Sequence, residues 1–361
     1  MEPIHPMPTA SDPRSATGQL VRWWPAALVV ILAGCTIFYF RVIREDSQQW
    51  RNLYSIETGI VATFLLLLWI LLLSRLRWKV RLLIFGGFVG FVGLMAGLFR
   101  IHGVTGDLVP ILKFRWSRSA LSLGSSTGNA TLNASPLPVE STNTYSGFLG
   151  PHRNATLPEG PRLARDWTAQ PPRKLWRQPI GAAWSGFAVV GNRAVTLEQR
   201  GDEEWAVCYE LPTGSVFWTH SDKARYYTTI AGEGPRTTPS IAGDKVLTLG
   251  ATGILNCLDF ATGRLIWSTD IIAKNQSHLP EWGVAGSPLV LGDQVIVNPC
   301  GKPDRSLVAY RLSNGEFAWS GGNDNASYSS PYAAFIGGIS QVLIFNQHAI
   351  FGHDAGTGRV L

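Results

Sequence analysis

Charged residues are scarce in this 361-residue chain: they make up 16% of it, whereas about 25% is usual. The 31 basic and 25 acidic residues leave a net charge of +6, and no block of like charges concentrates it. This distribution argues against a nucleic acid as partner. Aromatic residues reach 11%, with 14 Trp, which is the opposite of a disordered composition.

Cysteine is also rare, and common catalytic motifs are missing. The four cysteines are Cys35, Cys208, Cys257 and Cys300, and they form no CxxC, CxxCH or adjacent pair. Zinc knuckles, thioredoxin-like motifs and c-type haem attachment are therefore unsupported, and we expect no metal site. The chain also lacks a Walker loop, a GxGxxG, an HExxH and a Gly-x-Ser-x-Gly elbow.

Long apolar runs occupy most of the first hundred residues, at Trp23–Phe40, Gly59–Leu73 and Leu82–Phe99. A helix of about 18 residues reaches ~27 Å, close to the ~30 Å hydrocarbon core of a bilayer. We therefore expect a three-helix transmembrane module over residues 23–100, with the lipid bilayer as its partner.

Basic residues in the loops predict the orientation of these helices. The second link holds four of them and no acid: Arg75, Arg77, Lys79 and Arg81. The positive-inside rule places that link in the cytoplasm, so residues 1–22 form a cytoplasmic tail and the chain after Arg100 is exported. The expected location is the bacterial inner membrane, multi-pass, with the C-terminal part on the periplasmic side.

A lipoprotein reading is the alternative for the first apolar run. Leu32-Ala33-Gly34-Cys35 matches a bacterial lipobox, and cleavage there would leave a lipidated Cys35. The apolar run continues to Phe40, whereas a processed lipoprotein turns polar after its cysteine, so we favour a helix.

Residues 101–170 are rich in Ser, Thr, Asn and Pro without a sustained period, and we interpret them as an exported linker.

Residues 171–361 repeat one template four times, roughly every 50 residues. Each copy has an apolar run, a Gly-containing turn, alternating apolar residues, and a Thr-Gly or Asn-Gly turn. A Trp follows that second turn in the first three copies. The matching positions in the four copies are Glu210, Thr213, Gly214 and Trp218; Asp259, Thr262, Gly263 and Trp267; Asn314, Gly315 and Trp319; and Asp354, Thr357 and Gly358.

These residue types have physical reasons to recur. Gly takes the positive φ that tight turns need, and the upstream carboxylate can accept hydrogen bonds from the turn. The Trp lies on the next strand and offers a large surface for packing between units. Each unit of four short antiparallel strands is too small to bury its own faces, so radial stacking into a β-propeller is expected.

The [A/C]-x-[D/E]-x-x-T-G-x-x-x-W element resembles the tryptophan-docking motif of PQQ-like propellers. That superfamily includes quinoprotein dehydrogenases and the non-enzymatic BamB-type outer-membrane assembly propellers. The resemblance covers roughly Pro171–Leu361 and implies a ring of seven or eight blades, of which about four are present. The chain stops one position before the Trp expected in the fourth copy, so we interpret the propeller as incomplete.

Candidate ligand-binding residues precede the innermost strand of each copy. Trp184, Arg236 and Tyr328 lie directly before it, and Trp282 lies three residues before the corresponding Ala285. In a propeller these positions ring the channel mouth. The aromatic rings and the Arg could stack on an anionic planar ligand or anchor a peptide; ordinary rim packing is the alternative. Weaker candidates are His220, Lys223, Arg225, Asp304 and Arg305.

Two functions follow from these expectations. The favoured one is a membrane-anchored, exported propeller that binds an envelope protein or peptide as a scaffold, without catalysis. The alternative, implied by the resemblance, is a PQQ-dependent quinoprotein dehydrogenase that uses Ca²⁺, oxidises alcohols or sugars and passes electrons to the membrane. Alcohol-oxidising members carry a disulfide of adjacent cysteines, which this chain lacks, and its catalytic residues stay unassigned.

Overall fold

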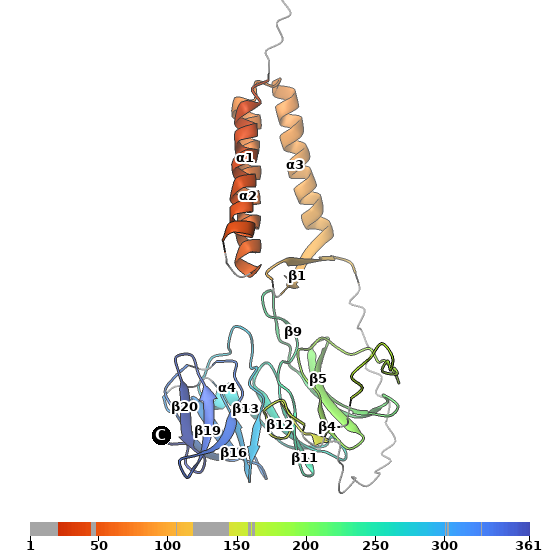
Figure 1. Ribbon diagram of the computed structural model, residues 1–361, viewed down its shortest axis with the longest axis vertical. Coiled ribbons are helices and arrows are strands. Elements are labelled where there is room, and N and C mark those ends of the chain that lie inside the picture. Colours follow the sequence, from red (N-terminus) through yellow and green to blue (C-terminus); the bar gives the residue numbers. More distant parts are fainter. Residues whose placement is uncertain are drawn as a thin grey trace, which may run out of the picture. The chain divides into compact units, whose positions relative to one another are not determined.

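The structure is a computed structural model that describes residues 21–44, 48–105, 107–117, 144–157, 160, 163–299, 301, 303–325 and 327–361. It divides into two compact units, Met1–Trp116 and Ser117–Leu361. The first unit is mainly helical, and the second consists of antiparallel β-sheets (Figure 1). Most of the expected cytoplasmic tail, much of the expected linker, and Cys300 lie outside the described residues.

Three helices form most of the first unit. They are α1 (Trp24–Phe38) with its π-helical end η1 (Tyr39–Ile43), α2 (Gln48–Leu68) with η2 (Trp69–Leu73), and α3 (Trp78–Leu98), which leads into the hairpin of β1 (Phe99–Val104) and β2 (Pro110–Phe114). All three are long and apolar enough to cross a membrane, as predicted. The second begins at Gln48 rather than Gly59, because its first turns mix polar and apolar residues and therefore form a helix without forming a continuous apolar run.

The second unit contains four sheets at the positions of the four predicted repeats. The first has β4 (Ala188–Val190), β5 (Arg193–Arg200), β6 (Glu203–Glu210) and β7 (Val216–Asp222), with β3 (Thr144–Tyr145) beside β4. The second has β10 (Ser240–Ala242), β11 (Lys245–Leu249), β12 (Ile254–Asp259) and β13 (Leu265–Asp270). The third has β14 (Leu289–Leu291), β15 (Gln294–Val297), β16 (Leu307–Arg311) and β17 (Phe317–Gly321). The fourth has β18 (Tyr332–Ile336), β19 (Ile339–Phe345) and β20 (Ile350–Asp354).

Three short elements connect or follow these sheets. Strands β8 (Tyr227–Thr228) and β9 (Gly232–Glu233) pair with each other, and the one-turn helix α4 (Ile271–Lys274) follows β13.

The four sheets pack as propeller blades. Their first strands, β4, β10, β14 and β18, lie next to one another in chain order, and Figure 1 shows the sheets following one another from green to blue. Buried apolar residues form three main clusters, one between each successive pair of sheets. The expected PQQ-like repeat fold, preceded by three apolar helices, is therefore confirmed.

An indole-on-glycine contact joins each sheet to the next. Trp218 on β7 lies against Gly263 of the second sheet so closely that a Cβ on Gly263 would fall 2.6 Å from the indole. Gly263 also has a φ of +72°, which side-chain-bearing residues rarely adopt. The indole N–H of Trp218 donates to the carbonyl oxygen of Phe260 at 2.9 Å. Glycine is thus required at this turn for two independent reasons.

The same contact recurs along the chain, with one variation. Trp267 packs on Gly315 and donates to the carbonyl of Leu312 at 3.0 Å. Trp319 packs on Gly358, but its N–H donates to the side chain of Gln294 at 2.9 Å rather than to a backbone carbonyl of the fourth sheet.

Carboxylates brace three of the four turns. Asp259 Oδ1 accepts hydrogen bonds from the backbone N–H and hydroxyl of Thr262, at 2.8 and 2.7 Å. Asp354 makes the same two bonds with Thr357, and Glu210 accepts from the hydroxyl of Thr213. In the third sheet Arg311 stands at the acid's position, and Asn314 accepts from the N–H of Glu316 instead. These side chains are engaged in local turn bonds, which matches a turn-stabilising role.

Sequence analysis overlooked Trp176, which repeats this contact at the start of the unit. Its indole lies against Gly214, and its N–H donates to the carbonyl of Leu211 at 2.6 Å. Trp176 stands before the first recognisable repeat, so no preceding Thr-Gly turn marks it. The sequence did contain a signal for it, because Trp176 precedes Trp218 by roughly one repeat length, as Trp218 precedes Trp267.

Part of the expected linker packs on the inner edges of the sheets. Thr144 and Tyr145 pair with β4, and the carbonyl of Ser146 accepts from the N–H of Ile241 on β10 at 2.7 Å. Arg153 reaches the third sheet, where its guanidinium donates to the carbonyls of Ser287 and Pro288 at 3.0 and 2.8 Å. Burial lowers the pKa of Arg153 to about 10. Residues 144–153 therefore bridge three blades.

Two of the three described cysteines are small buried packing residues. Cys208 and Cys257 are fully buried between sheets, and burial raises their thiol pKa values to about 12 and about 11. Cys35 lies within the uninterrupted helix α1.

We predict that Trp218→Ala lowers the free energy of unfolding of the propeller unit by about 3–5 kcal/mol, because it removes a buried indole and leaves a cavity between two blades. Trp184→Ala is the matched control: Trp184 is 68% exposed, so its loss should change stability by less than about 1 kcal/mol. Urea unfolding of the detergent-solubilised full-length chain measures both. Equal losses for the two variants would contradict the docking role.

Candidate functional site

The four expected ligand-binding residues, here called the rim cluster, lie together. They are Trp184, Arg236, Trp282 and Tyr328, and each comes from the loop before the first strand of a different sheet. The N–H of Trp184 donates to the carbonyl of Pro235 at 2.9 Å, beside Arg236. The Arg236 Nε donates to the carbonyl of Trp282, and the N–H of Trp282 donates to the hydroxyl of Tyr328 at 3.4 Å. Backbone and side-chain bonds thus connect all four blades at one end.

Arg236 holds the rim loops in place. A guanidinium has five N–H donors. Those of Arg236 point at four backbone carbonyl oxygens, which belong to Ala231, Gly232, Gly234 and Trp282. The guanidinium also lies over the ring of Tyr226, 4.8 Å from its centroid, and burial lowers its pKa. Because its N–H donors point at these carbonyls, Arg236 stabilises the rim loops and is not placed to donate a pair of hydrogen bonds to an anion.

The three aromatic residues of the rim cluster remain open to solvent. Trp184, Trp282 and Tyr328 are 68%, 42% and 46% exposed. Trp184 rests beside Gly232, where its Nε1 is 3.3 Å from the position a Cβ would take. Exposed indole and phenol rings on a braced loop offer flat apolar surface with polar edges, which suits stacking or peptide contacts.

A buried carboxyl group lies near the rim. Glu204 on β6 is only 5% exposed, and its Oε1 accepts from the N–H of Ala251 at 3.1 Å. Its Oε2 has no hydrogen-bond partner among the described residues. Burial, and secondarily the charge of Asp222, raises the pKa of Glu204 to about 7, while the Ala251 bond and the charge of Arg236 act in the opposite direction.

Sequence analysis overlooked Glu204, although a signal was present. Residues 204, 206 and 208 share one face of β6, and Ala206 and Cys208 are apolar and buried. A glutamate on that face is therefore an acid placed in a core position, which is unusual.

The weaker loop candidates lie outside the rim cluster. His220 on β7 approaches Asp222 at 3.6 Å, and Arg225 pairs with Glu233 at 3.0 Å. Asp304 bonds to Asn323, and Arg305 to Asn275. Lys223 is exposed.

The rim cluster does not assemble a site of the quinoprotein kind. Such a site needs cationic or amide groups for the cofactor's carboxylates and oxygen ligands for Ca²⁺. The donors of Arg236 are directed at backbone carbonyls, and no three His, Cys, Asp or Glu side chains in the described part of the chain are grouped to hold a metal ion. No catalytic step is therefore derived from these residues.

We predict that Glu204 makes the stability of the protein depend on pH. Its pKa is about 7 in the folded protein against 4.5 when exposed, so the folded state binds more protons between these values. This contribution to stability is present at low pH and is lost as the pH rises from about 4.5 through about 7. Relative to Glu204→Gln, the wild type should lose about 3 kcal/mol across this range.

Urea unfolding of the solubilised full-length chain at pH 5, 6, 7 and 8 provides the measurement. Glu203→Gln is the control, because Glu203 is the adjacent residue on the same strand and is more exposed. Parallel pH profiles for the wild type and Glu204→Gln would refute the prediction.

A family match agrees with the fold. The family model described as outer membrane protein assembly factor BamB, of the PQQ-like repeat type, matches residues 169–361, more than half of the chain. No curated protein sequence matches significantly. Among solved structures, BamB from Moraxella catarrhalis is 15% identical with a TM-score of 0.35, over 48% of this chain and 49% of that one.

A second similar structure is the quinohemoprotein alcohol dehydrogenase from Comamonas testosteroni. It is 16% identical with a TM-score of 0.39, over 50% of this chain and 34% of that one. The chain thus spans half or less of the length of these two structures. On the family match over its four sheets, the chain belongs to the PQQ-like repeat family of BamB-type proteins.

Proposed function

We propose that this protein is a membrane-anchored, exported PQQ-like propeller that acts as a binding module for an envelope protein or peptide. The observation that carries the proposal is the rim cluster, in which three exposed aromatic residues lie on loops connected through an arginine that is engaged with backbone carbonyls. Exposed Trp and Tyr residues on a rigid support are typical anchors of protein interfaces. A rim of this kind favours a peptide over a small anionic ligand.

Site-specific crosslinking tests this function in the intact chain. A photo-crosslinking amino acid that replaces Trp184 or Trp282 should capture a discrete envelope protein in cells. The same replacement of Trp167, an exposed indole outside the rim cluster, is the control and should not capture it. Identical adducts at all three positions, or none at positions 184 and 282, would refute the binding role.

The alternative function is a PQQ-dependent dehydrogenase, and its test is independent. The purified full-length chain is incubated with PQQ and Ca²⁺, and dye reduction is followed with alcohols and sugars. We expect no substrate-dependent reduction. Reduction that is lost in Trp184→Ala or Trp282→Ala would replace the binding role with the enzymatic one.

We propose the bacterial inner membrane as the location, with the propeller on the periplasmic side. Three apolar helices and the basic link from Arg75 to Arg81 support this orientation. Alkaline phosphatase, which is active only after export, should be active when fused after Leu361 and inactive when fused after Arg77. The reverse pattern would place the propeller in the cytoplasm.

A further inference from the structure

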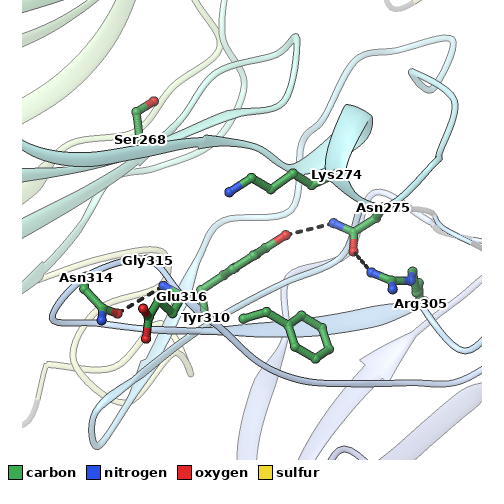
Figure 2. Close-up of a pocket in the computed structure, with 9 residues that line it drawn as sticks. Ser268, Lys274, Asn275, Arg305, Tyr310, Asn314, Gly315 and Glu316 are labelled. Atoms are coloured by element: carbon green, nitrogen blue, oxygen red, sulfur yellow. Dashed lines mark hydrogen bonds between the residues drawn. The ribbon is translucent and has the colours of Figure 1, made fainter.

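A cavity lies between the second and third sheets, away from the rim cluster. It has a volume of about 520 Å³, within the usual ~300–1,000 Å³ of small-molecule sites. Ser268 on β13 and the residues at the end of α4 line one side, and Tyr310 on β16 lines the other (Figure 2). Phe317 on β17 also lines the cavity. These are outer strands of their sheets, whereas the rim residues precede the innermost strands.

Lys274 supplies the first of two positive charges in this cavity. Lys274 is the last residue of α4. Asp270 caps this helix, because its Oδ1 accepts hydrogen bonds from the N–H groups of Ile272 and Ala273, both at 2.9 Å. Its side chain extends toward the space above Tyr310 (Figure 2). The ammonium group forms no hydrogen bond or ion pair with the described part of the chain. It is therefore available to a ligand.

Arg305 supplies the second positive charge of the cavity, from the loop between β15 and β16 of the third sheet. One of its Nη atoms donates to Asn275 Oδ1 at 2.9 Å, and the guanidinium lies 5.7 Å from the centroid of the Phe317 ring. No other hydrogen bond of this guanidinium is formed with a described residue. Unlike Arg236 in the rim cluster, Arg305 keeps most of its five donors for a ligand.

A buried asparagine links this arginine to a tyrosine hydroxyl. Asn275 is 1% exposed, and its Nδ2 donates to the hydroxyl of Tyr310 at 2.8 Å and to the carbonyl of Ile271 at 2.7 Å. Because the Tyr310 oxygen accepts from Asn275, its own proton is directed elsewhere. Burial raises the pKa of Tyr310, which keeps that proton in place as a donor.

We propose that this cavity binds a small anionic ligand through carboxylate or phosphate groups. Lys274, Arg305 and Tyr310 supply donors from two blades, and Glu316 is the one acid among the residues lining the cavity. Charge-assisted hydrogen bonds from Lys and Arg are the usual means of holding such groups. Because both sheets contribute, an occupied site would also tie the second and third blades together.

Isothermal titration of the detergent-solubilised full-length chain tests the proposal. The probes are inorganic phosphate and citrate, each at an ionic strength matched with sodium chloride. We expect saturable binding of at least one probe, weakened tenfold or more in Lys274→Met. Arg305→Met should weaken binding similarly, and Tyr310→Phe several-fold. The two probes distinguish a phosphate ligand from a carboxylate ligand.

Lys223→Met is the matched control, because Lys223 is also exposed but does not line the cavity. It should bind like the wild type. Lys274 is an exposed residue at a helix end, so Lys274→Met should fold normally and keep the test decisive even if Arg305→Met does not fold. Absence of saturable binding of both probes, or binding by Lys274→Met equal to that of the wild type, would overturn the proposal.

Discussion

The contact between an indole and a glycine turn is the interaction on which the rest of this structure depends. A sheet of three or four short strands cannot bury its two faces alone. Each Trp fills the gap to the next sheet, and the Gly of the turn leaves room for the ring while adopting a positive φ. The indole N–H finds a hydrogen-bond acceptor each time, so burying the ring does not leave its polar atom without a partner.

This stacking also decides where variable residues meet. Because every sheet repeats the same strand order, the loops before the first strands converge at one end. Residues at the same template position then become neighbours although the chain separates them widely. The rim cluster arises in this way, and the stack supplies a rigid frame on which side chains can differ from blade to blade.

Two arginines illustrate how tertiary contacts decide the role of a charge. The guanidinium of Arg236 is directed at backbone carbonyls, which makes it part of the frame. Arg305 has one described hydrogen bond and lines a cavity, which leaves it available for recognition. The rim cluster and the cavity between the second and third sheets therefore offer different chemistry, aromatic at the innermost strands and cationic at the outer ones.

The sequence by itself determined the repeated units, their Gly turns, the docking Trp residues and three membrane-length helices, since these depend on local periodicity and on residues a few positions apart. It also predicted the four residues of the rim cluster, because repeat positions convert directly into places in a propeller. Only the tertiary structure decided that Arg236 is engaged, that Glu204 is buried, that residues 144–153 bridge three blades and that Asn275 joins Arg305 to Tyr310. Apart from the three nearby carbonyls that Arg236 contacts, these features rest on hydrogen bonds or burial between segments far apart in the chain. No local pattern encodes which distant atoms will meet.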